Sequence, residues 1–220
     1  MLSDLVSLLF PSTCLGCGDS LTFEEEYICL RCKLDLPLTN DYLAVENTLF
    51  QKFAYENLIK SASSYMFYQQ NGIAQKLLKA LKYKGERYLG NYLGKLMAET
   101  LKGPDFTSII PIPIHRVKKR IRGYNQARHI AEGISEQLDR PIIEPIKRIR
   151  NPKSQTKKSR IERWKGLENI YGQCEADLSD QSILIVDDVI TTGATVGLLC
   201  ERLKEANVGA IHICSVARGK

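Results

Sequence analysis

The sequence predicts an α/β protein in which a doubly wound, mainly parallel sheet follows a small zinc-ribbon module. Three observations support this fold class. The apolar run of residues 183–186 has the composition of a strand buried on both faces of a parallel sheet. Acidic residues and a Thr/Gly-rich turn follow it and lead into a helical pattern, as in a βα unit. Four cysteines, paired as two CxxC motifs, occupy the first 32 residues.

The turn after this strand has the composition of a phosphate site. Hydroxyl side chains surround a glycine there, and the helical spacing of residues 196–203 begins directly afterwards. A helix N-terminus offers free backbone N–H groups and the positive end of the helix dipole, and both attract a phosphate. The residues expected to hold it are Thr191, Thr192, Gly193, Ala194 and Thr195.

Two carboxylates, Asp187 and Asp188, lie between the strand and this turn. Ionised carboxylates only accept hydrogen bonds, so they suit sugar hydroxyl groups or a Mg²⁺ ion rather than the phosphate itself. A ligand whose vicinal hydroxyls lie close to a phosphate is a ribose 5-phosphate. The structural alternative is a βα turn with acids at a strand end and no ligand, which many α/β proteins have.

The rest of the chain predicts the order of the elements. It divides into the cysteine module with a short N-terminal helix (1–36), a connector (37–58) and the sheet domain (59–220). Asn125 can cap the helix that starts at Gln126. Lys79, Lys82 and Lys84 are interpreted as a solvated face, with anion binding as the less common alternative. We expect strands at 61–68, 108–113, from 142, at 182–187 and at 210–216, a loop over 115–126, and helices from 73 to near 82–85 and at 88–101, 126–138 and 196–203.

The four cysteines of the module have the spacing C-x2-C-x11-C-x2-C and comprise Cys14, Cys17, Cys29 and Cys32. In a cytosolic chain, such closely spaced cysteines favour a metal over disulfides. Four thiolates suit a closed, structural Zn²⁺ site. A thioredoxin-like redox pair and a site that has lost its metal are the alternatives.

Positive charge is concentrated in one part of the chain. The net charge is +6, but residues 115–166 carry 16 Lys/Arg and 5 Asp/Glu, a local charge of +11. Such a block can serve phosphate-rich substrates, nucleic acid or both. The stretch 147–165 fits a loop that closes over substrate, or a solvated basic linker. The candidates for nucleic-acid contact are Arg122, Tyr124, Lys157, Lys158, Arg160 and Arg163, with Tyr124 suited to stacking a base unless it is packed.

The composition excludes a membrane span. Apolar residues make up 44% of the chain and charged residues 25%, as in soluble globular proteins. No apolar run approaches the ~20 residues of a spanning helix. The first ten residues lack the basic start of a signal peptide. We therefore expect a cytoplasmic protein.

These pieces together resemble one family. The motif from Val186 to Thr195 resembles the signature of type I phosphoribosyltransferases, which bind phosphoribosyl pyrophosphate (PRPP). The ordered set of the four-cysteine ribbon, Pro-Ile-Pro at 111–113, Arg-Gly-Tyr-Asn-Gln-Ala at 122–127, Ser-Gln-Thr at 154–156 and that motif is similar to the ComF (ComFC) competence protein family. The resemblance implies a phosphoribosyltransferase-like fold with an N-terminal zinc finger.

The resemblance also implies residue roles. Asp187 and Asp188 would be the catalytic pair that binds the ribose hydroxyls and biases Mg²⁺, and residues 191–195 would hold the 5-phosphate. His115 and Arg116 are candidates for the pyrophosphate loop. Ala194 stands where many related loops have Thr, so one hydroxyl donor is missing. Thr191 stands where 6-oxopurine salvage enzymes carry an acidic general base, which disfavours hypoxanthine or guanine as substrate.

Three functions follow as hypotheses. The first is a competence factor of natural transformation that binds PRPP and, through its basic surface, single-stranded DNA. The second is a metabolic phosphoribosyltransferase acting on an unidentified nucleobase or amine. The third is an adaptor whose zinc module docks a ComFA-type DNA helicase, the partner that the resemblance implies. The first and third are compatible with each other, and the sequence leaves enzymatic activity open because no pocket for a nucleophile is recognisable.

Overall fold

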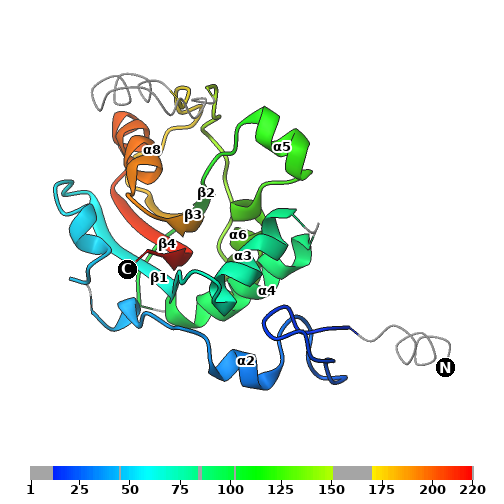
Figure 1. Ribbon diagram of the computed structural model, residues 1–220. Coiled ribbons are helices and arrows are strands. Elements are labelled where there is room, and N and C mark those ends of the chain that lie inside the picture. The colour runs from blue at the N-terminus through cyan, green and yellow to red at the C-terminus, as the bar shows by residue number, and fades with distance from the viewer. Residues whose placement is uncertain (1–11, 45, 84–85, 102, 151–169, 220) are drawn as a thin grey trace, which may run out of the picture.

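A four-stranded parallel sheet lies at the centre of the computed structural model, which describes residues 12–44, 46–83, 86–101, 103–150 and 170–219. The strand order is β1-β4-β3-β2 (Figure 1). The strands are β1 (Ile59–Phe67), β2 (Ser108–Pro111), β3 (Ser182–Ile190) and β4 (Ala210–Arg218). All neighbouring strands run parallel, so their carboxyl ends share one edge. The predicted fold class is confirmed.

The apolar run in β3 is buried on both faces of the sheet, as predicted. Ile183 and Ile185 pack into the core on one face, whereas Leu184 and Val186 pack into the core on the other. All four side chains are essentially inaccessible to solvent. This alternation follows from the period of two residues in a strand, and it explains why the run contains no polar position.

Helices cover both faces of the sheet (Figure 1). Buried leucines and isoleucines of α3 (Ile73–Tyr83), α4 (Arg87–Ala98) and α6 (Gln126–Leu138) join one core. Helix α8 (Ala194–Glu205) joins the other. Helices α4 and α6 approach so closely that a Cβ at Gly94 would lie 2.1 Å from the carbonyl oxygen of Ile130. The layers are therefore helix, sheet and helix, which is the doubly wound arrangement.

The structure corrects three expectations about local elements. The predicted loop over 115–126 contains a helix, α5 (Arg116–Arg122), in which no residue is buried; without a buried face it has no apolar periodicity to reveal it. The strand predicted from 142 is a single bridge between Ile142 and Ile109. Strand β3 continues beyond its apolar run to Ile190, so Asp187 and Asp188 lie within the strand rather than after it.

The connector is part of the folded domain. Leu49 and Phe53 are fully buried in the same core as α8. The carboxylate of Asp41 accepts hydrogen bonds from the backbone N–H of Ser64 and from the guanidinium of Arg218, with Nε 2.8 Å from Oδ2. This buried ion pair fixes the connector to the end of β4. Short 3₁₀ segments lie at Asp41–Leu43, Phe50–Lys52 and Glu99–Leu101.

The cysteine module packs against α3 and α4. Its short helix α2 (Leu30–Leu34) carries the buried Cys32. The ring centroids of Tyr27 and Tyr92 are 5.3 Å apart, and Lys76 Nζ donates to the carbonyl oxygen of Gly16 at 2.5 Å. The module therefore shares its core with the sheet domain. None of the helices in the described part of the chain is long and apolar enough to cross a membrane.

Candidate functional site

A cavity of about 200 Å³ lies at the carboxyl ends of β2 and β3. It brings together four of the predicted residues: Asp187, Asp188, Thr195 and Arg122. They come from β3, the start of α8 and the end of α5, which are distant in sequence. The cavity is also lined by Lys82, Ile112, Pro113, Ile114, Lys118, Asn125, Gln126, Ala127, Arg148 and Val189.

The two carboxylates of this cavity are held by their own backbone. Asp187 Oδ1 accepts a hydrogen bond from the N–H of Asp188 at 2.8 Å, and Asp188 Oδ1 accepts one from the N–H of Val189 at 2.9 Å. Burial, and then the neighbouring Asp188 carboxylate, raise the pKa of Asp187 well above its usual value. Carboxylate oxygens accept from ligand hydroxyls and also ligate Mg²⁺, so the pair suits either a diol or the ion.

Unpartnered polar atoms gather around the cavity. Among the described residues, four buried side-chain atoms lack a hydrogen bond, and three of them belong to residues that line it: Gln126 Nε2, Arg148 Nε and Asp188 Oδ2. Lys82 Nζ lies 2.5 Å from that Asp188 oxygen as an ion pair, without hydrogen-bond alignment. Since buried polar groups are normally paired, the two donors left open on Gln126 and Arg148 indicate a polar ligand.

The predicted phosphate turn begins α8 without a side-chain cap. Gly193 has φ 79°, the left-handed conformation that favours glycine. The hydroxyl of Thr192 accepts from the N–H of Ala194 at 3.4 Å, and the carbonyl of Thr191 accepts from Lys52 Nζ at 2.7 Å. Gly193 has no side chain to cap this helix, so the N–H groups that follow Ala194 in its first turn can meet an anion. Thr195 is the residue of this turn that lines the cavity.

Cations outnumber carboxylates around the cavity. Lys82, Lys118, Arg122 and Arg148 face two aspartates. Burial, followed by repulsion from Arg148, Arg122 and Lys82, lowers the pKa of Lys118. Such crowding is costly without an anion, because like charges repel in a partly buried site. The cavity is therefore built for a ligand more negative than a neutral sugar.

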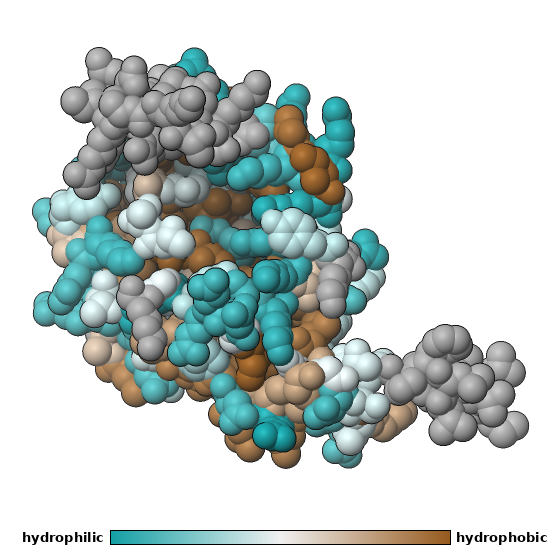
Figure 2. All heavy atoms as spheres, viewed as in Figure 1, coloured by the Kyte–Doolittle hydropathy of each residue, from teal (hydrophilic) through white to brown (hydrophobic). Residues whose placement is uncertain are grey.

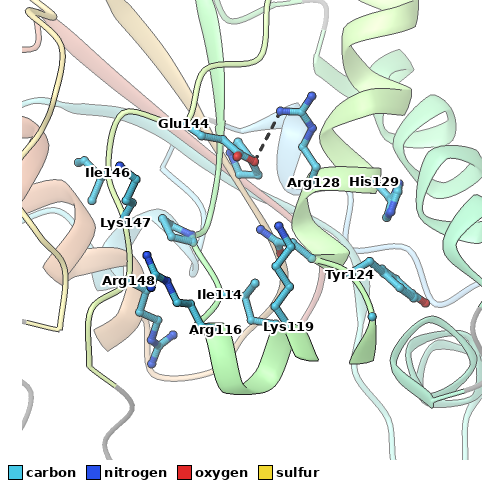
Figure 3. A pocket seen from close by; sticks show the side chains of 14 residues that line it. Ile114, Arg116, Lys119, Tyr124, Arg128, His129, Glu144, Ile146, Lys147 and Arg148 are labelled. Atoms are coloured by element: carbon cyan, nitrogen blue, oxygen red, sulfur yellow. Dashed lines mark ion pairs between the residues drawn. The ribbon is translucent and has the colours of Figure 1, made fainter. Parts of the chain in front are cut away.

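A second, larger groove of about 610 Å³ adjoins the first (Figure 3). The two share Pro113, Ile114, Asn125 and Arg148 as a common wall. Five cationic residues line the groove against one acid, Glu144, which lies 3.5 Å from Arg128 NH1. The cations are Arg116, Lys119, Arg128, Lys147 and Arg148.

The structure separates the other predicted residues. The His115 side chain caps α5 by accepting from the N–H of Val117 at 3.2 Å, and Arg116 lies in the groove rather than the cavity. Tyr124 donates its hydroxyl to the carbonyl of Leu81, and its ring packs edge-to-face with that of His129 at 5.1 Å between centroids, so it is largely a packed tyrosine. The remaining nucleic-acid candidates Lys157, Lys158, Arg160 and Arg163, and the motif at 154–156, lie outside the described residues.

The predicted metal ligands come together. The sulfur atoms of Cys14, Cys17, Cys29 and Cys32 all lie within 4.8 Å of one another, with Cys17 and Cys29 Sγ 3.7 Å apart. Tetrahedral Zn–S bonds of about 2.3 Å place sulfurs at about that separation. Burial raises the pKa of the Cys14 thiol, but hydrogen bonds from the backbone of Cys17, Cys29 and Gly16 outweigh it and lower that pKa to about 6. The cluster fits a metal such as zinc.

Sequence reasoning missed several cavity residues. Lys118 and Arg148 were part of a general basic block, and Lys82 was interpreted as solvated. The sequence feature that marks Lys82 is its position at the end of an amphipathic helix. The helix dipole favours a cation at this end of any helix, so the position alone does not indicate a binding site. The predicted cap of α6 is confirmed, since Asn125 Oδ1 accepts from the N–H of Ala127 at 3.2 Å. Its amide also donates to the carbonyl of Ile112 at 3.1 Å, fixing the wall between cavity and groove.

The chain is similar in sequence to known proteins. The phosphoribosyl transferase domain family matches residues 125–220. Competence protein F of Haemophilus influenzae is 26% identical over 93% of this chain and 84% of its own length. Competence protein ComFC of Bacillus subtilis is 31% identical over 66% of this chain and 61% of its own length. A glutamine PRPP amidotransferase structure from B. subtilis covers 64% of this chain and 30% of its own at 17% identity, with a TM-score of 0.44, too low for any conclusion.

The sheet and the domain match define the class: the protein is phosphoribosyltransferase-like, with a four-cysteine module before the sheet. The resemblance drawn from the sequence is confirmed within this class. The chain is a homologue of the ComF (ComFC) competence proteins.

Proposed function

We propose that the protein is a competence factor of natural transformation that binds PRPP, or a related sugar phosphate, in the cavity at the end of β3. One observation supports this choice of ligand most directly. The Asp187 and Asp188 carboxylates and the uncapped start of α8 at Thr195 meet at a cavity that contains unpartnered polar atoms. The competence names of the homologues support the biological role. Mg²⁺ bound with PRPP would neutralise its pyrophosphate, with Asp187 and Asp188 supplying oxygen ligands.

Calorimetry tests the ligand. PRPP with Mg²⁺ is titrated into the wild type and into the double variant Asp187→Ala, Asp188→Ala. We expect the variant to bind at least about tenfold more weakly, because the ligand hydroxyls lose their acceptors. Glu201→Ala, which removes an exposed carboxylate from α8, serves as the matched control and should bind as the wild type does. Equal binding by the double variant would contradict the proposed site.

Single-stranded DNA is proposed to bind along the basic groove of Figure 3. The groove holds five cations, and α5 beside it exposes Val117 and Ile121 between basic side chains. Figure 2 shows apolar spheres next to hydrophilic ones where α5 lies in Figure 1. Phosphates would lie on the cations, and salt would weaken this binding. We expect the protein to handle DNA in the cytoplasm. Four further basic residues are proposed to contact the DNA phosphates: Lys157, Lys158, Arg160 and Arg163.

The DNA proposal is tested by charge reversal. The double variant Arg116→Glu, Lys119→Glu should bind a single-stranded oligonucleotide more weakly, with the slope of log affinity against log salt reduced by about 1.4 for two lost contacts. Lys33→Glu, on the exposed surface of α2, is the control. A second variant reversing Lys157, Lys158 and Arg160 assigns the share of the basic loop. An unchanged slope in both variants would exclude these residues as the DNA surface.

A ComFA-type helicase is the proposed partner of the cysteine module. Leu30 and Leu34 on α2 are 63% and 78% exposed, and Phe23 of the same module is fully exposed. Apolar spheres appear at the position of α2 in Figure 2. Exposed apolar groups on a small module suit a protein partner. Leu30→Asp with Leu34→Asp should abolish binding to a purified helicase, whereas Leu43→Asp, equally exposed but in the connector, should retain it. Retained binding by the first variant would exclude this face.

A phosphoribosyl transfer is the alternative function. The groove shares a wall with the cavity, so an acceptor could lie beside the sugar phosphate. Release of pyrophosphate from PRPP in the presence of a panel of nucleobases and amines distinguishes the two. Turnover with one acceptor would establish a transferase, and binding of PRPP without turnover would favour the competence factor.

A further inference from the structure

A glutamine at the start of α6 places an unpartnered donor on the wall of the cavity. Gln126 is the first residue of α6, and only 3% of it is exposed to solvent. Its side chain lines the cavity at the carboxyl ends of β2 and β3. The amide nitrogen Nε2 is buried and has no hydrogen-bond partner among the described residues. A buried donor left unpaired destabilises the fold, so we expect a ligand to supply the missing acceptor.

The orientation of this amide is fixed by a neighbouring guanidinium. Arg122 NH1, at the end of α5, donates a hydrogen bond to Gln126 Oε1 at 3.0 Å. A guanidinium can only donate, so the amide must turn its oxygen towards Arg122 and keep its nitrogen for another partner. Gln126 therefore presents a donor, and not an acceptor, to the ligand.

The surroundings of Gln126 favour an anion at this wall. The residue stands in the first turn of a 13-residue helix, where the helix dipole attracts negative charge. Lys118, Arg122 and Arg148 line the same cavity, and the buried Nε of Arg148 is a second donor without a partner among the described residues. The start of α6 therefore combines an oriented amide, a helix N-terminus and three cations.

The other side of the cavity accounts for the ribose 5-phosphate part of the proposed ligand. Asp187 and Asp188 on β3 suit the sugar hydroxyls, and the start of α8 at Thr195 suits the 5-phosphate. The part of PRPP that remains is the pyrophosphate at C1 of the sugar. The wall at the start of α6 is the part of the cavity that remains to meet it.

The residues that the sequence suggested for the pyrophosphate have other positions. His115 accepts a hydrogen bond from the N–H of Val117 and caps α5, and Arg116 lines the adjoining groove. Neither of them lines the cavity itself. The pyrophosphate therefore needs partners from another element, and the start of α6 offers them.

An uncharged donor has an advantage at this position. A fourth buried cation beside Lys118, Arg122 and Arg148 would add repulsion and a large desolvation cost. An amide N–H of Gln126 can donate to a phosphate oxygen without either penalty. Such a donor responds to whether an oxygen acceptor is present at C1 of the sugar, and not to charge alone.

We propose that Gln126 is a specificity-determining residue that donates to an oxygen of the pyrophosphate and makes the cavity prefer PRPP to ribose 5-phosphate. The inference rests on the proposed function, since it concerns the same cavity. Mg²⁺ keeps its proposed place beside Asp187 and Asp188, because an amide N–H contacts a phosphate oxygen rather than the metal ion.

Calorimetry on the full-length protein, with Mg²⁺ present throughout, tests the proposal. We expect the wild type to bind PRPP more tightly than ribose 5-phosphate. Gln126→Met, which keeps the size of the side chain, should bind PRPP at least about tenfold more weakly, because a buried hydrogen bond to a charged group is lost. Its affinity for ribose 5-phosphate should stay within about twofold of the wild type.

Two further variants serve as a second test and a control. Gln126→Glu keeps the shape of the side chain and an acceptor for Arg122 but has no donor, so it should also weaken PRPP selectively. It replaces the Met variant if that variant does not fold, as thermal unfolding will show. Gln137→Met removes an exposed glutamine from the far end of α6 and should bind both ligands as the wild type does.

The pattern of affinities decides between a ligand contact and a structural role. Equal weakening of PRPP and ribose 5-phosphate in the Gln126 variants would overturn the proposal, because the amide would then only support the cavity. Unchanged PRPP binding would overturn it as well. In both cases the wild type still binds sugar phosphate and the proposed function stands. If the wild type binds neither ligand, the proposed function itself fails.

Discussion

The ring of Phe53 lies against the backbone at Gly193, where an added Cβ would come within 2.8 Å of Cζ and 2.9 Å of Cε1. Phe53 is buried in the connector, and Gly193 is the turn residue that precedes α8. The connector therefore packs against the predicted phosphate turn at Gly193. Lys52 of the connector also donates a hydrogen bond to the carbonyl of Thr191 in the same turn. Two neighbouring residues of the connector, Lys52 and Phe53, therefore contact this turn.

Gly193→Ala should damage both stability and ligand binding. An L-residue at φ 79° costs about 1–2 kcal/mol, and the new methyl group would also collide with the Phe53 ring. We expect a lower Tm and a weaker Kd for ribose 5-phosphate, measured by thermal unfolding and calorimetry. Gly103→Ala, where nothing lies within 4 Å of the added Cβ, is the control. An unchanged affinity in Gly193→Ala would show that the turn does not touch the ligand.

The carboxylate pair should distinguish ribose from deoxyribose. An ionised carboxylate accepts hydrogen bonds only, so the ribose hydroxyls are natural partners for Asp187 and Asp188. Replacing ribose 5-phosphate by 2-deoxyribose 5-phosphate leaves one acceptor unpaired, which costs about 1–3 kcal/mol, or roughly 5–150-fold in Kd. Both ligands carry the same phosphate, so the comparison isolates the 2-hydroxyl. Equal affinities would contradict the role of the pair, whereas discrimination would place bound DNA outside this cavity.

Stability should fall as pH rises because of Asp187. Burial and the Asp188 carboxylate raise its pKa, so the folded protein holds this proton to a higher pH than the unfolded chain does. Its contribution to stability is complete below the unfolded pKa of about 3.9 and is lost as pH rises through the raised folded pKa. We expect Asp187→Asn to gain Tm relative to the wild type as pH rises from 5 to 8.

The control for this pH series is Asp177→Asn, which removes an exposed aspartate bonded to Ser179. It should keep the wild-type slope of Tm against pH over this range. The cysteine site is common to all three proteins, so differences between variants report the aspartates. A difference between Asp187→Asn and the wild type that does not change with pH would exclude Asp187 as the titrating group.

Loss of the metal should destabilise the whole protein rather than the module alone. Cys14, Ile28 and Cys32 belong to the same core as the leucines of α3 and α4. We expect the wild type to contain one zinc ion per chain by elemental analysis, and Cys32→Ser to lose it. Since each kcal/mol corresponds to about 2–4 °C for a chain of this size, a fall in Tm of several degrees should follow. Cys174→Ser, outside the cluster, should keep both metal and Tm.

Local signals in the sequence predicted much of the fold and part of the site. The apolar run before Asp187 predicts a strand buried on both faces, because each of its side chains packs into one of the two cores. The two CxxC motifs brought four sulfurs together because their spacing sets the geometry. The cap of α6 by Asn125 could be predicted, because capping depends only on the residues that directly follow the cap. These features need no knowledge of distant contacts.

What the sequence did not reveal depends on distant contacts. Lys82 meets Asp188 only because the fold brings the end of α3 to β3, which lies more than a hundred residues later in the chain. Phe53 reaches Gly193 from a connector that showed no strong pattern. Arg148 could be assigned to the wall of two cavities only once its neighbours were placed. Helix α5 escaped prediction because it buries nothing.

Helix α3 touches the cysteine module near its start and the sugar-phosphate cavity at its end. Lys76 bonds to Gly16, and Lys82 pairs with Asp188, within a helix about 16 Å long. Removing the module would therefore also remove the contact of Lys76 with Gly16 and disturb the helix that carries Lys82. Genetic dissection needs alleles that alter only the outer leucines, Leu30 and Leu34, and leave the side facing α3 intact.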